Sequence, residues 1–186
     1  MVWLDRRRHV EQQLTAQALQ RHEAAVGSLG LPRSLDSARI LHFLEIRKDR
    51  EYADASTAFR LQEARVFLRV LGFDEEYCND RSAYAVLALL SLRPEMKWAQ
   101  ASNPILRITE MMAWIEEVYG KRYAANTRES FRRHTLLQFH HVGLVVQNPD
   151  RPDRPANSPR WCYQIRPTIH SMLTGRIRQP LFLEAD

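Results

Sequence analysis

The chain has 186 residues, of which 45% are hydrophobic, with a mean hydropathy of −0.45 and a sequence pI of about 9.6. This composition is typical of a globular protein and excludes a predominantly disordered chain. No apolar run approaches the roughly 18–20 residues that span a bilayer, and no apolar h-region follows the charged N-terminus, so we expect a cytoplasmic protein. The two cysteines, Cys78 and Cys162, are far apart and predict ordinary thiols with no metal site.

The first third of the chain is predicted to be helical. Helix formers fill residues 5–26, and Asp36 is a candidate N-cap for a second helix. A charged, solvated linker is expected at Arg47–Asp54, before a third helix that Ser56 or Thr57 caps and Gly72 ends. The side chains expected to be buried are Ile40, Leu41, Phe43 and Leu44 in the second helix, and Ala58, Phe59, Val66, Phe67 and Val70 in the third.

From residue 79 the pattern predicts a compact set of elements. Asn79 or Asp80 caps an apolar helix that ends before Pro94, and a second helix over residues 108–118 ends at Gly120. The arginine-rich helix (predicted over 126–141) is capped by Asn126 or Thr127, and Gly143 ends it. Two short strands follow, at 144–146 and 161–165, joined by a polar, proline-rich loop.

The order helix, helix, helix, strand, loop, strand is that of a winged helix-turn-helix. We therefore predict a mainly α fold, in which a helical N-terminal region adjoins a winged helix-turn-helix with a small two-stranded β wing. The expected division is a helical region of unknown role at 1–60, a winged-helix domain at 61–168 and a tail at 169–186. Within the tail, a short helix is expected through Ile169–Leu173.

Positive charge is concentrated in one stretch of the chain, Lys121–Arg166. This stretch holds nine Lys and Arg against three Asp and Glu, a net charge of +6, whereas the whole chain carries +5. The rest of the chain therefore sums to −1. Clustered positive charge of this kind is an electrostatic footprint for a polyanion such as DNA.

The arginine-rich helix presents polar and cationic side chains away from its expected core face of Phe131, Thr135, Phe139 and Val142. Arg, Asn and Ser side chains contact base edges in the major groove, and a helix N-terminus offers N–H groups to a phosphate. The alternative is a solvated helix face that only keeps the protein soluble, and the outward Leu137 favours either that alternative or packing against the wing. The candidate DNA-binding residues of the helix are Asn126, Thr127, Arg128, Glu129, Ser130, Arg132, Arg133 and His134.

The proline-rich loop and the segment before the helix supply further candidates. Arginines in such a wing are predicted to contact backbone phosphates or to enter a minor groove. Asp150 and Asp153 dilute the positive charge, so an inert connector is the alternative. The candidates are Lys121, Arg122, Arg151, Arg154, Asn157 and Arg160.

The sequence contains no convincing catalytic or metal centre. A Mg²⁺-dependent nuclease motif would need the lysine of the segment Asp36 to Lys48 one position earlier, on a strand rather than a helix. Arg128 with His134 has a spacing found in helical ribonucleases, but such pairs arise easily in an arginine-rich helix. His140-His141 has no third ligand at metal spacing. We predict no catalytic residue, no metal ligand and no cofactor in this chain.

About half of the chain resembles a known family. The run from Ala64 to Ile165 is similar to the N-terminal helix-turn-helix region of the BsuBI/PstI family of type II restriction endonucleases. The most specific shared pieces are NDRSA (79–83), YG-K-x-YA-x-NTRE-x-x-RR (119–133), QF-x-x-x-GLVV-x-NPD (138–150) and RP-x-NSP followed by Y-Q-I (154–165).

The resemblance implies the DNA-binding module of a Mg²⁺-dependent nuclease that cuts a palindromic site, normally as a dimer alongside a protecting methyltransferase. In that family the cleavage domain follows this region, whereas this chain stops about 20 residues after it. The expected Mg²⁺ would therefore belong to a nuclease domain that this chain lacks, and no catalytic residue is carried over. Residues 1–60 match nothing in the family.

Together these observations predict sequence-specific binding of double-stranded DNA, as the recognition module of a type II restriction endonuclease. A stand-alone winged-helix transcriptional regulator, dimerised through its N-terminal helices, is the main alternative. A protein-interaction module without nucleic acid is a third. We expect no small-molecule substrate and no membrane partner, and the sequence leaves the target bases and the oligomeric state open.

Overall fold

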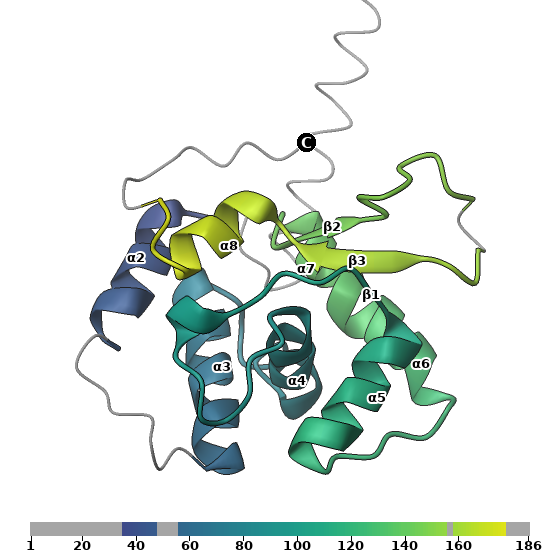
Figure 1. The fold of residues 1–186 in the computed structure, drawn as a ribbon, viewed down its shortest axis with the longest axis horizontal. Helices are drawn as coiled ribbons and strands as arrows, with labels where there is room; N and C mark the ends of the chain where they lie inside the picture. Colours follow the sequence, from purple (N-terminus) through teal and green to yellow (C-terminus); the bar gives the residue numbers. More distant parts are fainter. Residues whose placement is uncertain (1–34, 48–55, 156–157, 178–186) are drawn as a thin grey trace, which may run out of the picture.

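The structure is a computed structural model that describes residues 35–47, 56–155 and 158–177. The helix expected at residues 5–26, most of the linker at 47–54 and the wing residue Asn157 lie outside these ranges. The described residues are mainly helical with a small antiparallel sheet, which confirms the predicted fold class (Figure 1). The helices are α2 (Ser37–Glu45), α3 (Thr57–Leu71), α4 (Asp80–Leu89), α5 (Ile108–Tyr119), α6 (Thr127–Phe131), α7 (Leu137–His141) and α8 (Pro167–Leu173), and the strands are β1 (Leu106–Arg107), β2 (Val145–Gln147) and β3 (Cys162–Ile165).

Most of the predicted helix boundaries are confirmed by local capping. The carboxylate of Asp36 accepts the N–H of Ala38 at 2.8 Å, the Ser56 hydroxyl accepts that of Phe59 at 3.2 Å, and the Asn79 amide oxygen accepts that of Ser82 at 3.1 Å. Side chains of this kind satisfy N–H groups that have no partner inside the helix. Gly72 and Gly120 end α3 and α5 with φ values of 97° and 66°, a left-handed conformation that glycine adopts without strain.

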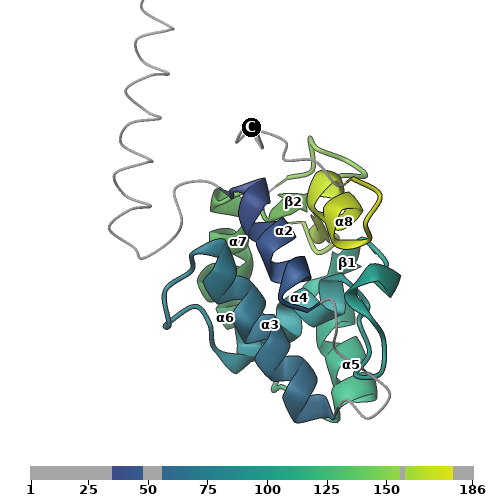
Figure 2. The same ribbon diagram turned by 90° about the vertical axis from the view of Figure 1, so that its left-hand side faces the viewer.

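The core forms around α4, which is buried from Ser82 to Leu89. Helix α3 packs along one side of it, while α5 and the arginine-rich helix cover other sides (Figure 1). Helix α8 also belongs to this core, because Ile169, Met172 and Leu173 are buried and α8 packs against α2 (Figure 2). The segment that the sequence assigned to a tail therefore closes the molecule beside α2, and the domain boundaries at residues 60 and 168 stay predictions.

The buried face of α3 differs from the one predicted. Ala58 is exposed and Phe59, Val66 and Val70 are half-buried, whereas Arg60 and Glu63 face the core with 0% and 1% of their surface exposed. Glu63 pairs with Arg60 at 2.5 Å and with Arg47 at 2.6 Å, and Arg47 is itself buried. We call Glu63, Arg47 and Arg60 the buried triad. The prediction that Arg47 begins a solvated linker is therefore wrong, since its charge is compensated inside the protein.

Arg60 and Glu63 of the buried triad have further hydrogen-bond partners. Arg60 donates to the carbonyl of Pro94 at 2.8 Å and also to the carbonyl of Met96, and the Trp98 indole donates to Glu63 at 3.3 Å. These bonds tie α2, α3 and the loop after α4 to one another. A buried ion pair is tolerated only when its remaining donors and acceptors are satisfied in this way.

The wing contains three strands. The two predicted strands correspond to β2 and β3, which pair antiparallel with Val145 opposite Ile165. Strand β1 comes from the segment before α5 and pairs with the other edge of β3, in the order β1-β3-β2. This third strand was not predicted. It brings the start of α5 to the base of the wing.

The arginine-rich helix runs through α6 and α7 (Thr127–His141) and contains a π-helical turn at Arg132–Leu136. The N–H of Leu137 donates to the carbonyl of Arg132, five residues back. At about 100° per residue, Phe131 and Phe139 would lie roughly 80° apart around a regular α-helix. The π turn absorbs one residue and brings both rings onto the core face, where Phe131 is 0% and Phe139 is 1% exposed.

Within the described parts of the chain, none of the helices has the length and apolar character needed to cross a membrane.

Candidate nucleic-acid interface

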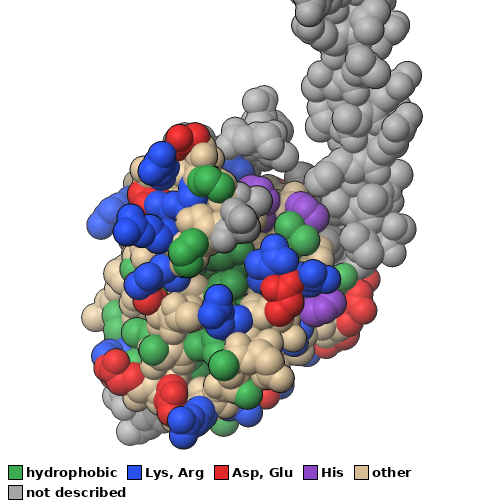
Figure 3. Space-filling view, turned by 90° about the vertical axis from the view of Figure 1, so that its right-hand side faces the viewer, with side chains coloured by type: hydrophobic (Ala, Val, Ile, Leu, Met, Phe, Trp, Pro, Cys, Tyr) green, Lys and Arg blue, Asp and Glu red, His purple; other side chains and the backbone are tan. Residues whose placement is uncertain are grey.

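A groove of about 630 Å³ lies between the arginine-rich helix, the start of α5 and the wing. Figure 3 shows this face of the molecule, with Lys and Arg side chains on both sides of a hollow in which hydrophobic side chains are visible. Its floor includes the half-buried Trp161 and the buried Tyr163. The residues that line the groove are Arg107, Ile108, Thr109, Arg128, Glu129, Arg132, Arg133, Leu137, Gln147, Ser158, Pro159, Trp161 and Tyr163.

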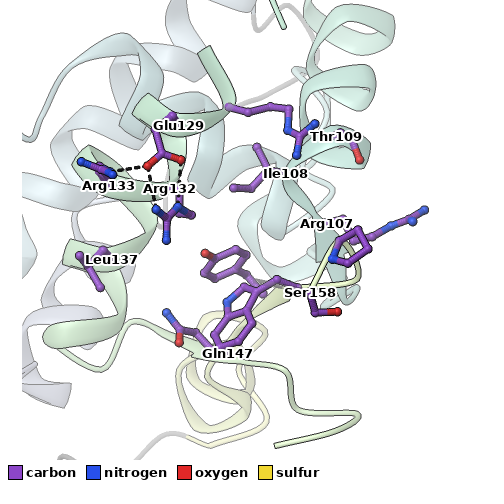
Figure 4. Close-up of a pocket in the computed structure, with 13 residues that line it drawn as sticks. Arg107, Ile108, Thr109, Glu129, Arg132, Arg133, Leu137, Gln147 and Ser158 are labelled. Atoms are coloured by element: carbon purple, nitrogen blue, oxygen red, sulfur yellow. Dashed lines mark hydrogen bonds and ion pairs between the residues drawn. The ribbon is translucent and has the colours of Figure 1, made fainter. Parts of the chain in front are cut away.

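Four arginines and one glutamate line the groove, so its lining carries a net charge of +3. The glutamate, Glu129, bonds to two of the arginines and forms what we call the exposed triad (Figure 4). Arg132 donates through Nε to Oε2 at 3.0 Å and through Nη2 to Oε1 at 2.7 Å, and Arg133 donates to Oε1 through Nε. These bonds lower the pKa of Glu129 to about 2, with the hydrogen bond from Arg132 as the largest cause.

Arg107 completes the cationic rim from the opposite side of the groove. It precedes α5 and bonds to Glu110, whose carboxylate also accepts the Arg107 N–H at 2.7 Å. The hydrogen bond from Arg107 is the largest cause of a lowered pKa at Glu110. This capping arrangement fixes the arginine beside the first turn of α5. On the floor, burial raises the pKa of Tyr163 to about 12, so its phenol stays neutral.

The structure brings some of the predicted helix residues to the groove and not others. Arg128, Glu129, Arg132 and Arg133 line the groove, while the exposed Asn126 and His134 lie outside its lining. Thr127 and Ser130 are half-buried and are also outside the lining. Leu137, which favoured the solvated-face alternative, lies in the groove beside the arginines (Figure 4).

The expected cap of the arginine-rich helix is wrong. Asn126 already has helical dihedral angles and its side chain makes no capping hydrogen bond. The N–H groups of Thr127 and Arg128 donate to the carbonyls of Ala124 and Ala125 at 2.9 and 3.3 Å. The preceding turn therefore occupies two of the N–H groups that were expected to face a phosphate.

The wing candidate Arg154 lies inside the wing, with 10% of its side chain exposed. Its guanidinium donates to Asp150 at 2.5 Å, to the Asn148 side chain at 3.1 Å and to the Arg160 carbonyl at 2.6 Å. Asn148 is buried and also accepts the N–H of Cys162 at 3.1 Å. This geometry favours a structural role for Arg154, which holds the two ends of the loop together, over the predicted phosphate contact.

The other wing and flank candidates that the structure describes, Lys121, Arg122, Arg151 and Arg160, are exposed but lie outside the groove lining. Arg151 pairs with Asp153 at 3.3 Å, and Arg160 is exposed next to the groove residue Pro159. Lys121 lies with its ammonium group 5.7 Å from the centroid of the Tyr123 ring, and Arg122 pairs with Glu116 at 3.5 Å.

Sequence inspection missed several residues of the groove, among them Arg107, Gln147 and Trp161. A signal existed for Arg107, because Arg-x-x-Glu directly before an apolar helical run is compatible with a capping arrangement. Gln147 was predicted as the first residue of the polar loop and Trp161 as the first residue of the second strand, and neither gave a separate signal. Their position in the groove depends on the pairing of β2 with β3.

Three helices followed by a β wing, with a cationic helix exposed beside the wing, define the winged helix-turn-helix class. The family model described as the BsuBI/PstI restriction endonuclease HTH domain matches residues 58–181. The chain belongs to this family, and its predicted membership is confirmed.

Individual relatives agree with this assignment. The type II restriction enzyme BsuBI of Bacillus subtilis is 43% identical over 105 residues, which are 56% of this chain and 33% of that protein. The type II restriction enzyme AplI of Arthrospira platensis is 36% identical over 107 residues, 58% of this chain and 33% of that protein. The solved structure of SdaI restriction endonuclease matches with a TM-score of 0.60 and 31% identity, covering 67% of this chain and 38% of that one. The similarity thus spans about a third of the length of these relatives.

Proposed function

We propose that this chain binds double-stranded DNA in a sequence-specific manner, as the recognition module of a type II restriction endonuclease. The observation that carries the proposal is the cationic groove between the arginine-rich helix and the wing. Arginines on a helix that borders such a groove have the geometry for base contacts, while the rim and the wing supply charge for phosphates. Membership in a family of restriction endonuclease helix-turn-helix domains supports this function.

The cleavage step is assigned to the part of the relatives that this chain does not match. BsuBI and AplI are named as type II restriction enzymes, and each is matched over a third of its length. In this proposal the Mg²⁺ that hydrolysis needs would be bound outside the matched third. Incubating the chain with plasmid DNA and Mg²⁺ is expected to leave the plasmid intact, and cutting would contradict this division.

The first test reverses two charges of the groove. We expect Arg132→Glu combined with Arg133→Glu to abolish duplex binding at low salt, because it replaces two cations at the centre of the groove with anions. Lys97→Glu combined with Arg176→Glu is the matched control, since it makes the same change in net charge at two exposed positions outside the groove. Fluorescence anisotropy with a labelled duplex gives the affinity, and circular dichroism checks that both variants fold. Unchanged binding by the groove variant, or equal losses in both variants, would overturn the assignment.

A salt titration measures how many phosphates the chain neutralises. With about five or six cationic contacts, the logarithm of the binding constant should fall against the logarithm of salt concentration with a slope of about −5. Binding that is indifferent to salt would favour a protein-interaction module instead.

Dimerisation stays a prediction. A homodimer would place two copies of the groove on the two halves of a palindromic site. Light scattering on the free chain and on its complex with duplex measures the stoichiometry.

A further inference from the structure

The exposed triad leaves a defined set of hydrogen-bonding groups unused. Arg133 is anchored to Glu129 through Nε, and its two terminal nitrogens make no hydrogen bond to any other described residue. Its side chain is 64% exposed and lines the groove. The guanidinium thus presents two parallel donors while its stem is held in place.

Glu129 also keeps acceptor capacity. A carboxylate offers about four lone-pair directions, and Arg132 and Arg133 use three of them. The remaining lone pair belongs to Oε2, since Oε1 accepts from both arginines, and the Glu129 side chain is 51% exposed and lines the groove. Arg133 and Glu129 together offer two donors and one acceptor, on two linked side chains that line the groove.

This pattern is the complement of one base pair. In the major groove a G·C pair presents N7 and O6 of guanine as acceptors, followed by the N4 amino group of cytosine as a donor. An A·T pair presents a donor, N6, in the middle position, where it would face a second donor of Arg133. A phosphate contact alone would not explain Glu129, because a carboxylate beside the arginines repels a phosphate.

We propose that Arg133 and Glu129 recognise one G·C pair of the target together, with Arg133 on guanine N7 and O6 and Glu129 on cytosine N4. Arg132 is a positioning residue, since it holds the Glu129 carboxylate in place with two hydrogen bonds. The inference rests on the proposed DNA-binding function and names the base pair that one part of the groove selects.

The test begins with the full chain and a pool of duplexes whose central positions are randomised. Duplexes retained by the wild-type chain are sequenced after several rounds, and we expect at least one invariant G·C pair. In the Glu129→Gln and Arg133→Ala variants the preference for G·C over other pairs at that position should fall by roughly 5-fold to 150-fold, the range for one bidentate contact. Arg151→Ala is the control, because it lies on the wing and should lower affinity without changing the selected sequence.

Modified bases then assign each atom. Replacing the invariant guanines one at a time with 7-deazaguanine removes N7. At one position this replacement should lower the affinity of the wild-type chain for the duplex and leave the affinity of the Arg133→Ala variant unchanged. N4-methylcytosine at the same pair should lower the duplex affinity of the wild-type chain more than it lowers the affinity of the Glu129→Gln variant. Arg133→Lys should not restore the preference, because an ammonium group lacks the parallel pair of donors.

The outcomes separate the two proposals. If the wild-type chain retains no duplex even at low salt, the DNA-binding function itself fails. If it selects a sequence that lacks an invariant G·C pair, or if Arg133→Ala is as sensitive to 7-deazaguanine as the wild type, DNA binding stands and the assignment of this pair is overturned.

Discussion

The protein contains two triads in which one glutamate bridges two arginines, and their surroundings give them different roles. In the buried triad, Glu63 pairs with Arg47 and Arg60, and all three side chains are less than 10% exposed. In the exposed triad, Glu129 pairs with Arg132 and Arg133, and each side chain is at least half exposed. The same chemistry therefore occurs once inside the core and once on the surface.

The difference lies in what each triad offers to another molecule. In the buried triad, backbone carbonyls and the Trp98 indole occupy donors and acceptors that the ion pairs leave over, so these groups hold α2, α3 and a loop together. The exposed triad keeps two donors of Arg133 and a lone pair of Glu129 without a hydrogen bond to any described residue, on side chains that line the groove. A surface ion pair of this kind adds little to stability, so its value is in the geometry that it gives to the arginines.

The largest effect is expected from Glu63→Gln. This change leaves two buried arginines without their carboxylate, and breaking a buried pair costs about 3–5 kcal/mol in the free energy of unfolding. The matched change Glu129→Gln should leave the free energy of unfolding unchanged within error. Urea denaturation of both variants checks the comparison, and similar losses of stability in the two would break it.

A second pair of variants compares an exposed arginine of the wing, Arg151, with one enclosed by the wing, Arg154. Arg151→Ala removes an exposed cation, so it should weaken binding to all duplexes alike and reduce the salt slope by about 1. Arg154→Ala removes the bonds to Asn148 and to the Arg160 carbonyl, so it should loosen the wing. Amide hydrogen exchange at Cys162, whose N–H donates to Asn148, measures this loosening. Faster exchange in Arg151→Ala than in Arg154→Ala would reverse the roles given to the two arginines.

The smallest effect concerns the titration of Glu129. Its pKa is lowered from 4.5 to about 2, so the carboxylate is fully ionised and paired above pH 4.5, and its ion pairs are lost as the pH falls through about 2. Side-chain carboxyl shifts followed by NMR should give a midpoint near 2 in the wild-type chain. Arg132→Gln should raise this midpoint toward 4.5, because it removes the largest cause of the shift. A midpoint near 4.5 in the wild type would mean that the exposed triad does not form in solution.

Local signals made much of the fold predictable. Asp36, Ser56 and Asn79 cap helices as expected, and Gly72, Gly120 and Gly143 all adopt positive φ at helix ends. Each of these depends on a side chain and a few neighbouring residues, which a sequence displays directly. The stretch of concentrated charge also contains three of the four arginines that line the groove, Arg128, Arg132 and Arg133.

Features that depend on distant partners could not be predicted in the same way. Strand β1 has only two residues and no alternation, so its pairing with β3 decides its structure. Arg60 and Glu63 suggested a solvent-facing side of α3, because nothing local shows that Arg47 and the Pro94 carbonyl complete their environment. Arg154 looked like a wing cation, and only the folded loop reveals its contacts with Asn148 and Asp150.

The π turn in the arginine-rich helix determines which changes of sequence and of length this helix can accept. Side chains exposed in the groove, such as Arg133 and Leu137, can be exchanged while Phe131 and Phe139 stay in the core. Removing one residue between Arg132 and Leu136 would leave Phe131 and Phe139 seven positions apart, roughly 20° from each other around a regular α-helix, so both rings would still face the core. A change of target sequence is therefore open to this segment by substitution. A single deletion would replace the π turn by a regular α-helical turn, whereas an insertion would rotate one half of the helix so that either the core or the groove side chains lose their positions.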